Sequence, residues 1–250
     1  MNDIYKINDY LKKLLEPKEI SDVAINGIQV ENDGEIKRIA FAVDASIASI
    51  EKAIKEDCNL LIVHHGLFWG KVNPITLNYR KRIKLLLENN IGLIAFHLPL
   101  DCNSECGNNA QILKRIGVSD LVSFGYYKGF PIGFMGEFDN SLDIDQICNK
   151  LGLLLHGIKY LNFGTKEIKK IAVVSGGGGS CFDEAIQKKV DLFITGDAEH
   201  TLYHMAAENK INLLFAGHYF TETFGIKAIQ KKIEEEFNIY TIFCDIPTGL

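Results

Sequence analysis

Three short segments of this 250-residue sequence carry side chains that can bind metal ions, and each follows an apolar run typical of a buried strand. The segments are His64–Gly66, His97–Asp101 and His218–Glu222. In parallel α/β sheets, ligands bind beyond the carboxyl ends of the strands. Imidazole and carboxylate together suit Zn²⁺, Fe²⁺, Mn²⁺ or Ni²⁺ better than Ca²⁺ or Mg²⁺. The segments therefore predict a transition-metal centre at the carboxyl edge of a sheet.

The spacing within these segments indicates how the ligands would share ions. Adjacent strand residues point to opposite faces, so His64 and His65 can serve one centre only if the chain leaves the strand there, which Gly66 permits. Such a pair suits two neighbouring ions better than one. His218 and Glu222 are four residues apart and lie on one face if a helix begins at this point. A carboxylate such as Glu222 can bridge two ions, which would activate a water for hydrolysis.

Each of these residues also has a simpler interpretation. A single histidine of this kind is more often a hydrogen-bonded core residue, and only the whole group favours a metal centre. Because Pro99 disfavours helix at Leu98, we expect the segment 97–101 to be a turn. Cys102 and Cys106 are alternative ligands, but no matching pair exists elsewhere in the sequence.

Several other features are weaker candidates for substrate binding. Gly177 and Gly178 lie in a glycine-rich link between a strand and a helix, where bare amides can bind phosphate, although the link can equally be a flexible turn. Trp69 could stack on a base near the metals or seal the core. Asp197 could line the same cleft or cap the next helix.

Asn108 and Asn109 precede a predicted helix and are expected to be no more than helix caps. His156 has no partner in the sequence and is expected to be structural.

An internal repeat shows which elements must position these residues. Residues 36–63 align without a gap with residues 168–195, and residues 88–94 resemble residues 208–214. Each copy has an apolar β-branched run, a turn, an amphipathic helix and a second apolar run, followed by a further helix and strand. Strand–helix–strand units imply parallel strands with right-handed crossovers. Any two such units look alike, but the ungapped match favours duplication.

The repeat predicts an α/β fold of two interlocked lobes, with mixed, mostly parallel sheets and flanking helices. Residues 1–125 and 220–250 would form a metal-binding lobe, and residues 126–219 a second lobe carrying the duplicated unit. A helix over about 222–237 and a strand over 239–243 would return the chain to the first lobe.

Composition excludes several classes of protein. The formal net charge is −5, which argues against a protein that chiefly coats nucleic acid. No apolar run approaches the roughly 18 residues that a membrane span needs, so no membrane partner is expected. The first residues lack a basic start followed by an apolar core, and we expect a cytoplasmic protein.

The motifs also resemble those of a known family. The matching stretches are NGIQVE (26–31), VHHGLFW (63–69), HLPLD (97–101), GNNAQ (107–111), SGGGGS (175–180), FITGD (193–197) and AGHYFTETFGI (216–226). The chain thus resembles the Nif-three-like dinuclear metal-centre proteins, known as GTP cyclohydrolase 1 type 2 homologues. The stretches span nearly the whole chain.

The resemblance implies a toroidal homohexamer, a trimer of dimers, with two divalent ions per subunit (Fe, Zn, Mn or Ni) facing an internal cavity. The ligands that it implies are His64, His65, Asp101, His218 and a bridging Glu222. His97 would lie beside them as an extra ligand or a proton-transfer group. Related sequences often carry Glu where this chain has Asp197.

Two functions of different classes follow. The first is a dinuclear-metal-dependent hydrolase acting on a nucleotide-like substrate, with GTP cyclohydrolase activity as the specific form: water would add at C8 of guanine and His97 would shuttle protons. The second is a metal-containing, ring-shaped scaffold that binds nucleic acid or a protein partner. In that case Tyr79–Lys84 and Lys166–Lys170 would contact phosphates.

Overall fold

The computed structural model describes residues 2–15, 20–153 and 158–250, so that His156 lies outside the described residues. The chain divides into two compact units. The first unit comprises Met1–Leu100 and Gly225–Ile246, and the second comprises Asp101–Phe224 and Pro247–Leu250. The chain therefore enters the second unit after Leu100 and returns to the first within a long helix. The division suggested by the sequence had its boundaries near residues 125 and 219.

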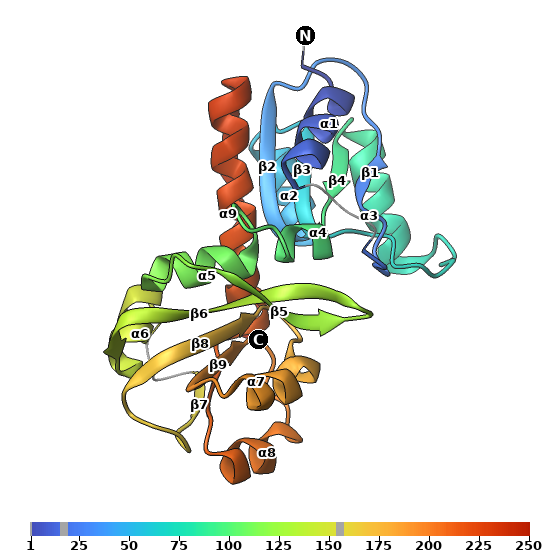
Figure 1. Cartoon of the computed structure of the whole chain (residues 1–250). Helices are drawn as coiled ribbons and strands as arrows, with labels where there is room; N and C mark the ends of the chain where they lie inside the picture. Colours follow the sequence, from blue (N-terminus) through green and yellow to red (C-terminus); the bar gives the residue numbers. More distant parts are fainter. Residues whose placement is uncertain (1, 16–19, 154–157) are drawn as a thin grey trace. The chain divides into compact units, whose positions relative to one another are not determined.

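The first unit is built on a five-stranded sheet in the order β1-β4-β3-β2-β11 (Figure 1). Its elements are α1 (Ile4–Leu15), β1 (Gly27–Val30), β2 (Arg38–Asp44), α2 (Ile47–Lys55), β3 (Leu60–His65), α3 (Leu77–Glu88), β4 (Gly92–Ala95) and β11 (Tyr240–Phe243). Strands β4, β3, β2 and β11 are parallel, and only β1 is antiparallel to its neighbour. β11 thus joins the sheet of the first unit.

Both faces of this sheet are buried, which explains why its central strands are continuous apolar runs. Ala40, Ala42, Leu61 and Val63 pack against the helices α2 and α3. The residues between them in the strands point to the other face and are also fully buried. Ser46 is the N-cap of helix α2, and its side chain forms a capping box with Ser49.

The second unit is built on a six-stranded mixed sheet in the order β5-β6-β8-β9-β10-β7. Its elements are α5 (Asn108–Ile116), β5 (Val122–Tyr127), β6 (Phe130–Leu142), α6 (Ile144–Leu151), β7 (Lys159–Leu161), β8 (Ile168–Val174), η1 (Gly179–Cys181), α7 (Phe182–Lys188), β9 (Leu192–Thr195), α8 (Leu202–Asn209) and β10 (Asn212–Phe215). β8, β9 and β10 are parallel, and the outer strands β5, β6 and β7 are antiparallel to their neighbours.

Helices cover both faces of this second sheet. Ile171 and Val173 pack on one face with residues of α5 and α6, and Ala172 and Val174 pack on the other with residues of α7 and α8. Figure 1 shows these two pairs of helices on opposite sides of the sheet. The alternation follows from the two-residue period of a strand.

Two further helices carry the chain between the units: α4 (Leu98–Asp101) and α9 (His218–Phe237). The prediction of a non-helical turn over 97–101 was wrong, because Leu98–Asp101 forms a single turn of α-helix. A proline in the first turn of a helix lacks only an N–H that would have no intrahelical partner there, so Pro99 is compatible with it.

The two copies of the repeat have the same strand register. Ile39 pairs with Leu60 and Leu60 with Gly92 in the first unit. The corresponding pairs in the second unit are Ile171 with Leu192 and Leu192 with Asn212.

The helix ends of the two copies match as well. Asp57 and Lys189 follow the first helix of each copy, and Asn90 and Lys210 follow the second; all four have left-handed backbone conformations with φ between 51° and 56°. The fold is therefore the mixed α/β architecture that the sequence predicts. Among the described residues, no helix combines the length and apolarity needed to cross a membrane.

Candidate metal centre

Three imidazole rings gather at the carboxyl ends of β3 and β4 in the first unit. One ring nitrogen from each of His64, His65 and His97 lies within 4.8 Å of those of the other two. The ring centroids of His64 and His65 are 4.6 Å apart. Because β3 ends at His65, the adjacent side chains of His64 and His65 both reach this edge of the sheet. His64 is fully buried, whereas His65 is partly exposed.

The Nδ1 atom of each ring is held by an oxygen of the first unit. The three distances are 3.0 Å from His64 to Phe96 O, 2.9 Å from His65 to Asp44 Oδ1 and 2.8 Å from His97 to Asp22 Oδ1. A carbonyl or carboxylate oxygen can only accept, so Nδ1 carries a hydrogen in each ring. In the neutral ring, the lone pair is then on Nε2. Metal-binding histidines commonly have this arrangement, because a second group fixes the ring and its tautomer.

The carboxylate that holds His97 is itself deeply buried. The Asp22 side chain is 4% exposed. Burial by itself would raise the pKa of Asp22, but the hydrogen bond and charge of His97, with hydrogen bonds from Asn26 and the Ala24 amide, lower it to about 2. Asp22 is therefore ionised at neutral pH.

Trp69 lies beside two of these rings. Its ring centroid is 5.6 Å from that of His65 and 5.1 Å from that of His97. Its indole nitrogen donates to Gly66 O at 3.0 Å, which fixes the side chain against the turn after β3. The indole thus forms an apolar wall next to the histidine cluster.

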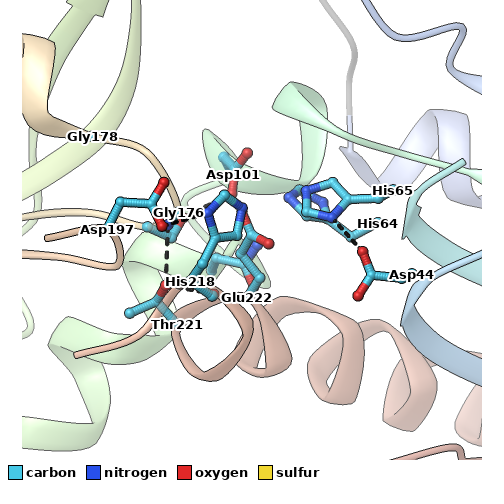
Figure 2. A network of polar contacts seen from close by, with 12 residues as sticks. Asp44, His64, His65, Asp101, Gly176, Gly178, Asp197, His218, Thr221 and Glu222 are labelled. Carbon is cyan, nitrogen blue, oxygen red and sulfur yellow. Dashed lines mark hydrogen bonds and ion pairs between the residues drawn. The ribbon is translucent and has the colours of Figure 1, made fainter. Parts of the chain in front are cut away.

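In the second unit, helix α9 presents an imidazole and a carboxylate one turn apart. His218 is the first residue of α9, and its Nε2 lies 3.2 Å from Glu222 Oε1. Its Nδ1 lies 2.9 Å from Asp197 Oδ1 (Figure 2). The Glu222 side chain is 4% exposed.

The two carboxylates strongly affect the protonation of His218. The hydrogen bond with Glu222 raises its pKa most, burial opposes the rise, and the charges of Glu222 and Asp197 add to it, giving a value of about 9. Without a bound cation, His218 is therefore protonated at neutral pH. A divalent cation that binds this ring must displace that proton.

Hydrogen bonds from neighbouring side chains hold a second carboxylate of this unit, that of Asp101. Asp101 is buried, and its Oδ1 accepts hydrogen bonds from Asn108 Nδ2 and Ser175 Oγ, both at 2.9 Å. Asn109 donates to the Asp101 carbonyl at 3.2 Å and accepts from the Ser175 amide at 2.6 Å. Asn108 and Asn109 are therefore not helix caps, since Gly107 occupies the N-cap position of α5.

The glycine-rich segment supports these side chains through its backbone. Gly176 N donates to Thr221 Oγ1 and Gly178 N to Thr195 Oγ1, each at 3.0 Å. Gly177 lies next to the Asp197 carboxylate, 3.3 Å from where its Cβ would be. Two amides of this segment thus already have internal acceptors.

Within each unit, the structure therefore gathers a group of candidate residues. The first group contains His64, His65, His97 and Trp69; the second contains Asp101, His218, Glu222 and the segment with Gly177 and Gly178. In the described part of the chain, no cysteine belongs to a candidate metal cluster. Cys106 instead lies buried with its Sγ donating to Asn103 Oδ1 at 3.3 Å.

Sequence reasoning missed the residues that hold the candidate ligands. Asp22 and Asp44 lie 75 and 21 positions from the histidines that they bind. No spacing rule links residues so far apart. The one available signal was the polar character of Asn108 and Asn109 at the start of an otherwise apolar helix face.

Comparison with known proteins identifies relatives over the full length. A family model described as Duf34/NIF3 (NGG1p interacting factor 3) matches residues 2–248. A protein of Archaeoglobus fulgidus is 43% identical over 96% of this chain and 97% of its own length. One of Pyrococcus abyssi is 42% identical over 98% of both chains. Both are named "GTP cyclohydrolase 1 type 2 homolog".

A solved structure shares the whole fold. The crystal structure of TTHA1606 from Thermus thermophilus is 33% identical, with a TM-score of 0.90, and the match covers 99% of this chain and 100% of that one.

Proposed function

Since the chain belongs to the Duf34/NIF3 family, we propose that it is a dinuclear-metal-dependent hydrolase that acts on a nucleotide-like substrate, with GTP as the first candidate. The family match confirms the resemblance carried by the sequence motifs. The residues that would hold the two divalent ions are His64, His65, Asp101, His218 and Glu222.

The observation that carries this proposal is the histidine cluster of the first unit. Three rings with neighbouring nitrogens, each fixed at Nδ1 by an oxygen, form a donor set suited to a transition-metal ion. The second group adds a buried carboxylate, Glu222, next to an imidazole. Mixed nitrogen and oxygen donors of this kind fit Fe, Zn, Mn or Ni.

The residues of the chain have distinct tasks in such a reaction. A pair of divalent cations supplies a nucleophilic water at neutral pH and stabilises developing negative charge. His97 lies beside His64 and His65, and its Nε2 lone pair can take the proton that the attacking water loses. Trp69 offers an apolar surface against which a base can stack. In GTP, the attacked atom would be C8 of guanine.

The test combines metal content with turnover. Chelator-treated protein is reloaded with each metal, and bound ions are counted by elemental analysis while GTP hydrolysis is followed by chromatography. We expect two ions per chain in the wild type, and loss of both binding and turnover in His65→Ala and Glu222→Ala. His204→Ala, which removes an exposed histidine of α8, is the matched control. Equal turnover in wild type and both ligand variants would refute the hydrolase mechanism.

The scaffold function receives less support from the structure. In the basic segment Tyr79–Lys84, Lys81 Nζ lies 3.3 Å from Glu51 Oε1 and Lys84 Nζ lies 3.5 Å from Glu88 Oε1. These carboxylates offset part of the positive charge of the segment. A ring-shaped homohexamer remains part of the proposal, to be measured by the mass of the particle in solution. Nucleic-acid binding that weakens steeply with salt, in protein without turnover, would favour the scaffold instead.

A further inference from the structure

Asp22 lies in the segment before β1 and reaches His97 across the first unit. Its side chain is buried, and its two oxygens accept four hydrogen bonds from groups in the described part of the chain. Oδ1 accepts from Ala24 N at 2.9 Å and from His97 Nδ1 at 2.8 Å. Oδ2 accepts from Asn26 Nδ2 at 2.9 Å and from Leu98 N at 3.1 Å. Among the described residues, each of these four partners of the carboxylate is therefore a donor.

Three of the four donors cannot become acceptors. Ala24 N and Leu98 N are backbone amides, which only donate. The amide of Asn26 is fixed in orientation because its Oδ1 accepts from His97 N at 2.7 Å. Turning Asn26 over would place two donors against each other at His97 N. The imidazole of His97 is the one group of the four whose hydrogen can move between two atoms.

We propose that Asp22 is a positioning residue that holds His97 in the Nδ1–H tautomer and thereby presents its Nε2 lone pair to the cluster formed with His64 and His65. This inference deepens the proposed function, since that lone pair would take the proton of the attacking water or bind an ion. The tautomer itself follows from the hydrogen bonds of the first unit and needs no metal.

The variant Asp22→Asn separates this role from simple packing. It keeps the shape of the side chain but turns one oxygen into an NH₂ group. If the NH₂ group takes the place of Oδ2, which faces Asn26 and Leu98 N, two hydrogen bonds are lost. If it takes the place of Oδ1, which faces His97 and Ala24 N, only the bond from Ala24 N is lost, because the NH₂ group can donate to the His97 ring. The second orientation is favoured, and it makes Nδ1 of His97 an acceptor. The hydrogen then moves to Nε2.

Nitrogen NMR of the histidine rings measures the tautomer directly. Chelator-treated full-length protein with ¹⁵N-labelled histidine is studied in mildly alkaline buffer, and the signals of His97 are assigned with His97→Gln. We expect Nδ1–H in the wild type and Nε2–H in Asp22→Asn. Asp44→Asn is the matched control, because it should change the signals of His65 and leave those of His97 in place.

The wild-type spectrum alone can overturn the proposal, even if the variant fails to fold. A wild-type His97 with its hydrogen on Nε2 would refute it, as would a folded Asp22→Asn protein with the wild-type tautomer. Asn26→Ala provides a second variant: it removes one donor but leaves the bond from His97 to Asp22, so the tautomer should remain Nδ1–H.

Function gives an independent readout in the metal-loaded protein. Loss of an outer partner of a metal-site histidine typically costs about 10- to 100-fold in metal affinity or activity. We expect a loss of this size in kcat or metal affinity for Asp22→Asn, and none for Asp33→Asn, an exposed control. Wild-type protein that binds no metal would refute the proposed function but not the tautomer. Wild-type rates in a variant with the inverted tautomer would overturn the role of Asp22.

Discussion

Gly176 leaves no room for a side chain next to Glu222. A Cβ at this position would overlap Glu222 Oε1 and would lie 3.1 Å from His218 Nε2. The backbone also has a φ of +58°, which residues other than glycine rarely adopt. Both the limited space and the backbone conformation therefore favour glycine at position 176, next to the candidate ligands His218 and Glu222.

The substitution Gly176→Ala should displace Glu222 and lower metal affinity by about tenfold or more. The left-handed backbone should add about 1–2 kcal/mol of destabilisation. Gly129→Ala is the matched control, because Gly129 has a φ of +82° and nothing within 4 Å of its Cβ position. Calorimetric metal titration and urea unfolding of both variants separate the two effects. If the two variants bound metal equally well, Gly176 would have no role at the ligands.

The hydroxyl of Ser175 should set the position of Asp101. Ser175→Ala removes the hydrogen bond from its hydroxyl to Asp101 Oδ1 and leaves that from Asn108. We expect metal affinity to fall about tenfold, with a loss of roughly 1–2 kcal/mol in the free energy of unfolding. Ser123→Ala, an exposed site on β5, is the control for removing a hydroxyl from this unit. Unchanged affinity in Ser175→Ala would show that Asp101 does not depend on this bond.

The ionised Asp22 should contribute to stability in a defined range of pH. Its pKa is lowered from 3.8 to about 2 in the folded chain, so the contribution is complete above about pH 4 and is lost as the pH falls through 2. The difference corresponds to about 2 kcal/mol. Between about pH 5 and pH 2, chelator-treated wild type should therefore lose about that much more unfolding free energy than Asp22→Asn. Parallel losses in the two proteins, measured by urea unfolding, would contradict this.

Asn59 and Asp191 hold the first strand of each copy of the repeat in the same way. Asn59 Oδ1 accepts from the amides of Lys37 and Arg38, and Asp191 Oδ2 accepts from the corresponding pair in the second unit. Asn59→Ala and Asp191→Ala should each cost about 1 kcal/mol in stability.

Hydrogen exchange locates each effect. The amides of Lys37 and Arg38 should exchange faster in Asn59→Ala, and those of Lys169 and Lys170 in Asp191→Ala, each relative to wild type. Faster exchange of both pairs in either variant would show that the two bonds do not act separately.

The sequence by itself determined the features that depend on near neighbours along the chain. The apolar runs predict the strands of both sheets, because a strand buried on both faces needs apolar residues at every position. The spacing of four places His218 and Glu222 one helical turn apart, since a helix repeats every 3.6 residues. The repeat predicts the parallel order, and β2, β3 and β4 have the same register as β8, β9 and β10.

Only the tertiary structure decided which groups hold the candidate ligands. Asp22 meets His97, and Ser175 meets Asp101, across 75 and 74 residues. These pairs depend on strand order, on register and on the paths of loops, and a local pattern carries none of these. A hydrogen bond needs its two atoms within about 3 Å, and only the packed chain sets distances that small between remote residues.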